Sequence, residues 1–257
     1  MESAKELFKN NVVVFGIVVG VAWVASAFVL AGGITQVNKK DAISVTGTAE
    51  KIVKSDSGKL TFSIVREADP QNYVSVSKKI AEDAKTTVVY LKEEGIDEKD
   101  VTILPLTSSA ICQSQNQVLY DGKGNQRCAG DFTYSLSEQI IVDSTNVDLI
   151  QSLSLLLANE LANRKVFAQI NTVEYFYTKL SDLRVELLKE ATKNAKERAS
   201  AIAESTGSII GRVRDASQGV FQVTGKNSIE VSDYGSYDTS AIEKKVTALV
   251  RASFEVR

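Results

Sequence analysis

Residues 12–34 form a run of 23 residues, from Val12 to Ile34, in which no side chain is charged. As a helix rising about 1.5 Å per residue, this run would be about 35 Å long, which is enough to cross a hydrocarbon core of about 30 Å. We therefore predict a transmembrane helix that acts as a signal anchor, between a short polar tail (residues 1–11) and a linker (residues 35–41). The alternative is a cleaved signal peptide, because residues 25–27 (Ala-Ser-Ala) have the small side chains of a cleavage site.

The apolar run also carries small residues at helical spacing. Gly16 and Gly20 are four positions apart, and Ala22 and Ser26 repeat that spacing. Small residues allow the backbones of membrane helices to approach closely, although glycine and alanine are frequent in such helices in any case. The pattern gives the hypothesis that the anchor associates with a second copy through Gly16 and Gly20.

The two cysteines bear on which side of the membrane the rest of the chain lies. Cys112 and Cys128 flank a polar segment whose centre, residues 121–124, has the residue types of a hairpin turn. Antiparallel arms would bring the two thiols together, and a disulfide would persist only in an oxidising compartment. Two unrelated thiols are the alternative. We predict a disulfide and, with it, a single-pass protein whose C-terminal domain is extracytoplasmic, periplasmic or extracellular.

Residues 42–257 alternate between strand-like and helix-like patterns. Alternation of apolar and polar residues predicts strands at residues 43–53, 59–66, 101–107, 132–142, 166–177 and 246–256. Apolar residues at steps of three and four predict helices at residues 70–95, 147–161 and 178–207. The second of these helices is so apolar that we expect it to be well buried.

This order of elements constrains the fold class. Hairpins and helices are interspersed, without the strict βαβα alternation of a doubly wound parallel sheet. We predict one α+β domain over residues 42–257, with mixed, largely antiparallel sheet or sheets and about three helices, preceded by the transmembrane helix.

A polar segment from Val223 to Ile242 interrupts the C-terminal strands. It is rich in Gly, Ser and Asp and too long for a tight turn, so it is either a functional loop or a flexible excursion. Tyr234 and Tyr237 lie within it, and tyrosines among Ser, Gly and Asp are typical of contact loops. We predict that these two tyrosines contact a partner.

Composition excludes several classes of function. The chain has no histidine, which removes the commonest general base near neutral pH and the commonest transition-metal ligand. Its net charge is -2 and no long basic run is present, so nucleic acid is not an expected partner. We predict no catalytic, cofactor-binding or metal-binding residues and no cofactor, because the sequence contains no phosphate-binding loop, dinucleotide fingerprint or nucleophile elbow.

Residues 44–49, 91–101 and 180–207 are three segments that together resemble a known family, the SIMPL-domain family of exported bacterial proteins. Residues 44–49 (SVTGTA) resemble its opening VTGxG strand, although Thr48-Ala49 replaces the second glycine of that pattern. Residues 91–101 (LKEEGIDEKDV) resemble its helix-to-strand junction, and residues 180–207 resemble its long alanine-rich helix. The resemblance implies export, a tendency to oligomerise and an association with stress tolerance. It carries no catalytic residue onto this chain.

These observations lead to one principal hypothesis of function and two alternatives. The principal hypothesis is a membrane-anchored, extracytoplasmic, non-enzymatic protein of the cell envelope that assembles with itself into a scaffold, because anchoring raises the effective concentration of weakly interacting domains. The first alternative is a module that binds a ligand or protein through residues 223–242. The second is an enzyme that uses carboxylate or lysine chemistry.

Overall fold

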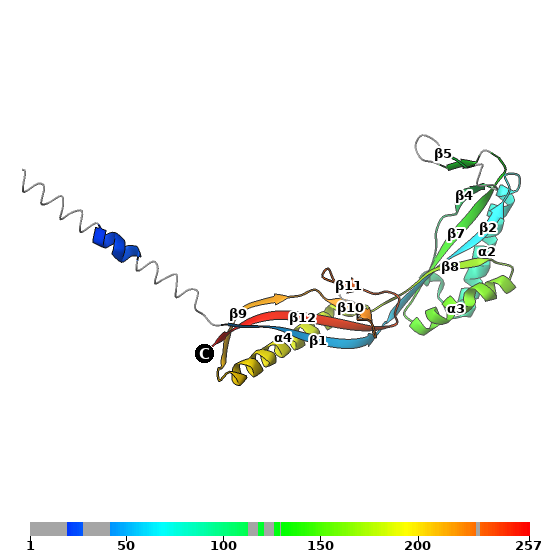
Figure 1. The fold of residues 1–257 in the computed structure, drawn as a ribbon. Coiled ribbons are helices and arrows are strands. Elements are labelled where there is room, and N and C mark those ends of the chain that lie inside the picture. The colour runs from blue at the N-terminus through cyan, green and yellow to red at the C-terminus, as the bar shows by residue number, and fades with distance from the viewer. Residues whose placement is uncertain (1–19, 28–41, 113–117, 121–125, 129, 230–231) are drawn as a thin grey trace, which may run out of the picture. The chain divides into compact units, whose positions relative to one another are not determined.

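The computed structural model describes residues 20–27, 42–112, 118–120, 126–128, 130–229 and 232–257. Its strands are β1 (Ala42–Lys54), β2 (Ser57–Ala68), β3 (Val101–Ile103), β4 (Thr107–Cys112), β5 (Val118–Tyr120), β6 (Gln126–Cys128), β7 (Phe132–Ser144), β8 (Ala168–Phe176), β9 (Ile210–Gln218), β10 (Gln222–Gly225), β11 (Ser236–Tyr237) and β12 (Glu243–Val256) (Figure 1). Its helices are α2 (Tyr73–Glu93), α3 (Val147–Asn163) and α4 (Leu180–Ser205), with a 3₁₀ turn at Glu98–Asp100.

These elements confirm the predicted α+β class. One five-stranded sheet has β12 between β1 and β10, with β9 also paired to β12 and β11 paired to β10. The other has the order β3-β7-β2-β8, with β4 also paired to β7. All the pairings described in register are antiparallel except that of β10 with β11. The three predicted helices are all present.

The chain divides into two compact units. The terminal unit comprises residues 1–48, 189–219 and 249–257, and the central unit comprises residues 49–188 and 220–248. Three elements, β1, α4 and β12, contribute residues to both units.

In the terminal unit, α4 packs on the sheet through alanines. Ala191, Ala195, Ala199 and Ala203 recur every four residues and all are fully buried, which places them on one face of the helix. Ala195 and Ala199 form a cluster with Val45, Ala252 and Phe254 of the neighbouring strands (Figure 1). Short side chains on the helix let its backbone lie close to the strands.

Gly47 of β1 lies directly against the backbone of α4. A Cβ built on Gly47 would lie 2.1 Å from the carbonyl oxygen of Ala191 and 2.4 Å from the backbone nitrogen of Ala195. Only glycine fits at this position in this packing. Side chains of α4 also bind the strand's backbone, because Asn194 accepts a hydrogen bond from the Thr48 N–H and Arg198 donates one to the Thr46 carbonyl oxygen.

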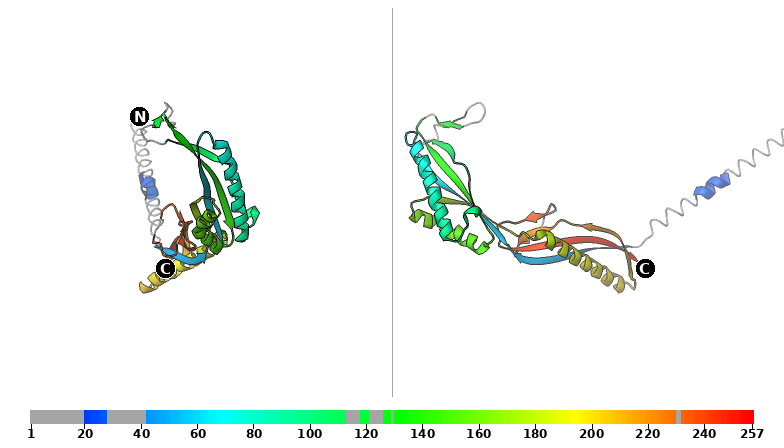
Figure 2. Two further views of the ribbon diagram at one scale, coloured as in Figure 1. Left: turned by 90° about the vertical axis from the view of Figure 1, so that its right-hand side faces the viewer. Right: turned by 180° about the vertical axis from the view of Figure 1, so that it is seen from behind.

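In the central unit, α2 and α3 pack on one face of the β3-β7-β2-β8 sheet (Figures 1 and 2). Alternate residues of the central strand β2, namely Leu60, Phe62 and Ile64, are fully buried against Ile80 and Leu91 of α2 and against Ile150, Leu153 and Leu157 of α3. The regular alternation of β2 along its length therefore supplies the core.

The expectation that the helix at residues 147–161 is well buried is wrong for two of its leucines. Leu153 and Leu157 lie in the core, but Leu155 is 72% exposed and Leu156 is 55% exposed. One face of a helix on a sheet accommodates residues at steps of three and four, and the run LSLLL places two leucines outside that stripe.

Candidate functional site

The polar segment at residues 223–242 is fixed to the sheet at both ends. Residues 222–225 form β10, which pairs with residues 244–247 of β12, and residues 236–237 form β11, which runs parallel to β10. Sequence reasoning did not anticipate these short strands. They leave residues 226–235 as the projecting part, of which residues 230 and 231 lie outside the described structure.

The buried side chain of Lys244 holds residues 238–241 of this segment in place. Its side chain is fully buried, and its amino group donates hydrogen bonds to the backbone carbonyl oxygens of Asp238 and, at 2.7 Å, of Ala241. Burial lowers the pKa of Lys244, although the nearby Asp238 carboxylate acts in the opposite direction. A lysine enclosed in this way acts as an anchor for the turn at residues 238–241.

The side chain of Asp238 also stabilises this turn. Its carboxylate accepts hydrogen bonds of 2.7 Å from both the backbone N–H and the hydroxyl of Ser240. Burial raises the pKa of the Asp238 carboxyl, but the bonds from Ser240, the Ala241 N–H and the charge of Lys244 outweigh burial, so that the pKa lies below its ordinary value. The turn is therefore a fixed structure near neutral pH.

This fixed turn forms one wall of an open groove in the central unit. The groove has a volume of about 710 Å³. Its lining comes from α3, from β8, from the residues that follow β10 and from those that precede β12: Gln151, Ser154, Leu155, Tyr175, Gly225, Lys226, Asn227, Ser228, Ser240, Ala241, Ile242 and Glu243. Segments distant in the sequence thus meet at one surface, which we call the α3 groove.

The lining of the α3 groove is part polar and part apolar, and its two charged residues are paired. Lys226 and Glu243 are its two charged residues, and they form an ion pair of 2.9 Å. Burial raises the pKa of Tyr175, and a hydrogen bond with Ser154 acts in the opposite direction. The Ser154 hydroxyl donates its own proton to the Gln151 carbonyl oxygen at 2.7 Å, so the contact with Ser154 engages the buried phenol of Tyr175 within the fold.

The tyrosines predicted as contact residues do not line the groove. Tyr234 is 98% exposed, beside Gly235, whose positive φ of 88° suits a glycine. Tyr237 lies in β11, with its ring 6.0 Å from the amino group of Lys244. The groove residues Gln151 and Ser154 of α3 were missed because polar residues on a separate segment carry no local signal, whereas Asn227 lies within the segment 223–242 that the sequence singled out.

The predicted disulfide is confirmed. Cys112 and Cys128 are bonded, with their Cα atoms 5.3 Å apart. The turn predicted at residues 121–124 lies outside the described residues, although β5 and β6 on either side pair antiparallel.

Little of the predicted anchor falls within the described structure. Residues 20–27 are helical. A Cβ added to Gly20 would have no neighbouring atom within 4 Å. Gly16, the other half of the predicted contact pair, lies outside the described residues. Within the part of the chain that is described, no helix is both long and apolar enough to span a membrane.

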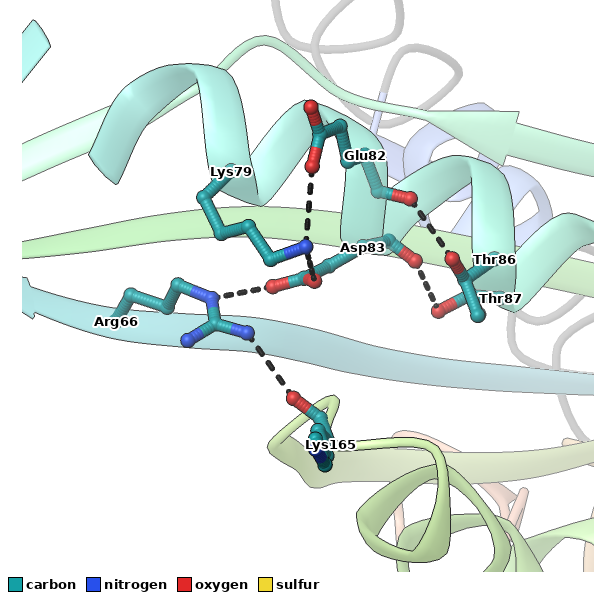
Figure 3. Close-up of polar contacts among 7 residues, drawn as sticks. All are labelled: Arg66, Lys79, Glu82, Asp83, Thr86, Thr87 and Lys165. Atoms are coloured by element: carbon teal, nitrogen blue, oxygen red, sulfur yellow. Dashed lines mark hydrogen bonds and ion pairs between the residues drawn. The ribbon is translucent and has the colours of Figure 1, made fainter. Parts of the chain in front are cut away.

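A second polar cluster in the central unit joins three elements (Figure 3). The carboxylate of Asp83 on α2, with a side chain only 3% exposed, accepts a hydrogen bond from Nε of Arg66 on β2. The guanidinium of Arg66 also donates to the carbonyl oxygen of Lys165, at 3.0 Å, and Lys165 has the positive φ of 63°. The cluster holds α2 and the turn after α3 on β2, and we assign it to the fold.

Metal chemistry has no candidate residues in the described part of the chain, where no group of three or more His, Cys, Asp or Glu side chains could hold a metal ion.

Comparison with protein families identifies the family of this chain. A family model matches residues 43–254: the SIMPL model, described as a protein of unknown function (DUF541). No curated protein matches the chain.

Proposed function

Since the chain belongs to the SIMPL family, we propose that it is a membrane-anchored, extracytoplasmic and non-enzymatic protein of the cell envelope that assembles with copies of itself. The compartment is supported by the Cys112–Cys128 disulfide, because structural disulfides persist where the surroundings are oxidising. The anchor is supported by the uncharged run at residues 12–34.

The observation that carries self-assembly is the outer edge of β4. This strand, Thr107–Cys112, pairs with β7 and with no other strand of the described structure. It contains no charged residue, and its first five residues are exposed. An exposed and uncharged edge strand offers unpaired N–H and C=O groups to a strand of another chain.

Two other edge strands are protected by features that β4 lacks. Side chains of α4 occupy backbone groups of β1 at Thr46 and Thr48. Strand β9 carries Arg212, Arg214 and Asp215 and has two register shifts against β12. Charge and bulges both discourage edge pairing. The contrast within one chain favours β4 as the strand that pairs.

The sequence of β4 also suits pairing with itself. In an antiparallel pair centred between Ser109 and Ala110, Ser108 would face Ile111 of the second copy and Thr107 would face Cys112. None of these pairs brings like charges together. Such a contact is isologous, as in a two-fold symmetric dimer.

The proposal is tested by the mass of the detergent-solubilised full chain and of a chain that begins at Lys39, measured by light scattering after size exclusion. We expect the same multimer for both. Ser109→Lys should reduce the mass by placing a charge on the β4 edge, whereas the matched control Ser217→Lys, on the already charged β9, should not. A multimer of the full chain alone would assign assembly to the Gly16/Gly20 helix, and monomers in both cases would refute the proposal.

A second candidate function is that of a binding module that acts through residues 223–242. The α3 groove favours it, because two fixed parts of this segment line a concave surface. Stabilisation of the chain by an added ligand would be the supporting measurement.

A further inference from the structure

We infer that the α3 groove binds a neutral, polyhydroxylated ligand, that is, a saccharide. This inference rests on the second candidate function and names its ligand class. It is independent of assembly through β4.

The size of the groove suits a small ligand. Its volume of about 710 Å³ falls within the range of roughly 300–1,000 Å³ that is usual for small-molecule sites. It is open, so that an oligomer could enter with its ends in solvent.

The balanced charge of the groove favours a neutral ligand. Lys226 and Glu243 neutralise each other at 2.9 Å, and a backbone hydrogen bond from Lys226 to Glu243 holds the two residues together. A ligand with a net charge would have to break this ion pair to find a counter-charge. A neutral ligand leaves it intact.

The hydrogen-bonding groups of the groove match hydroxyl groups. Gln151 and Asn227 are exposed and line the groove from two separate segments, α3 and the residues after β10. Each amide offers both donors and an acceptor, and a sugar hydroxyl is likewise both donor and acceptor.

Leu155 supplies the apolar contact that a sugar ring requires. It is 72% exposed on the wall of the groove, where Ala241 and Ile242 continue the apolar surface. A pyranose presents C–H groups on one face and hydroxyls around its rim, so it can cover Leu155 while its hydroxyls reach the amides. The inference thereby gives a role to a leucine that the core does not use.

The test uses the full chain in dodecyldimethylamine oxide, because alkyl glycoside detergents carry sugar headgroups that would compete. Binding is measured by saturation-transfer NMR and calorimetry with three probes: the neutral tetra-N-acetylchitotetraose (chitotetraose hereafter), anionic tetragalacturonate and a capped tetra-alanine peptide. We expect chitotetraose alone to bind. Gln151→Ala and Asn227→Ala should each weaken binding about five-fold through loss of one hydrogen bond, whereas Asn159→Ala, an exposed amide of α3 outside the groove, should not.

Each of the other outcomes would overturn one part of the proposal. Binding of the anionic saccharide or the peptide without chitotetraose would refute the ligand class but keep the binding module. Binding of none of the probes would count against both the inference and the second candidate function. Binding of chitotetraose that the two groove variants leave unchanged would refute the location. The light-scattering measurement reports on assembly in every case.

Discussion

Replacing Gly47 by alanine would place a methyl group against the backbone of α4. The added carbon would lie 2.1 Å from the Ala191 carbonyl oxygen, 2.4 Å from the Ala195 nitrogen and 2.7 Å from the Ala195 Cβ. Real Cβ atoms essentially never lie within 3.0 Å of another heavy atom, and two of the three atoms belong to the helix backbone. No change of side-chain rotamer can relieve the contact, so the helix itself must move.

The cost can be estimated from the contacts that such a movement disturbs. Overpacking of a core usually costs about 1–3 kcal/mol, and a displaced helix backbone belongs at the upper end. The hydrogen bonds from the Thr48 N–H to Asn194 and from Arg198 to the Thr46 carbonyl oxygen would also be strained, at about 1 kcal/mol each. We expect Gly47→Ala to destabilise the packing of α4 by about 3 kcal/mol or more.

Hydrogen exchange read by mass spectrometry is the suitable assay, because a chain with two compact units need not unfold in one step. A loss of 3 kcal/mol corresponds to exchange that is roughly 150-fold faster. We expect this acceleration in peptides from residues 189–205 of α4 and little change in peptides from α2. Local opening energies of this kind are what hydrogen exchange measures.

Gly58→Ala is the matched control. Gly58 is also a strand glycine that faces a helix, but its added Cβ would meet the side chain of Ile150 at 3.1–3.2 Å, and a side chain can yield by a few tenths of an ångström. We expect a cost of about 1 kcal/mol or less. If exchange in α4 were within two-fold of the unmodified chain after Gly47→Ala, the explanation of this glycine would be wrong.

Three further predictions concern the central unit. Replacing both Cys112 and Cys128 by serine should lower its free energy of unfolding by about 3 kcal/mol, the chain-entropy value for a loop of this size, as measured in urea. Asp83→Asn leaves a partly buried arginine without its counter-charge and should cost about 3 kcal/mol, whereas Glu82→Gln, at an exposed ion pair, should cost less than about 1 kcal/mol. Burial raises the pKa of the Glu138 carboxyl above its ordinary value of 4.5. The folded chain therefore binds this proton more tightly than the unfolded chain, and the free energy of unfolding should fall as the pH rises through the folded pKa. Glu138→Gln should remove this fall, as measured by urea unfolding at pH 4 and pH 7.

The sequence predicts the elements of this fold well where periodicity is long. Strand β12 alternates over its whole length and α2 keeps its apolar spacing over five turns, so both were located within a few residues. Strand β11 has only two residues, and its pairing with β10 depends on the path of the intervening chain. No local pattern encodes such a strand.

The groove could not be predicted for a related reason. Gln151, Tyr175 and Asn227 lie on three elements and meet only because α3, β8 and the segment after β10 pack together. The excess leucines of α3 were a usable signal, since one helix face cannot bury all of LSLLL. We interpreted them as evidence of deep burial, whereas Leu155 lies exposed on the groove wall.

The two parts of the chain that resemble and depart from the family pattern have different physical roles. Residues 44–49 and 180–207 carry the resemblance, and they meet at Gly47, where the alanines of α4 lie on β1. That pattern therefore encodes a close helix–strand contact, which any chain of this fold needs. The residues of the α3 groove at positions 225–228 and 240–243 lie outside these segments, although they fall within residues 43–254, which the family model matches. Because the contact at Gly47 does not involve them, a related chain with a different segment between β10 and β12 should keep that contact while its groove has a different lining.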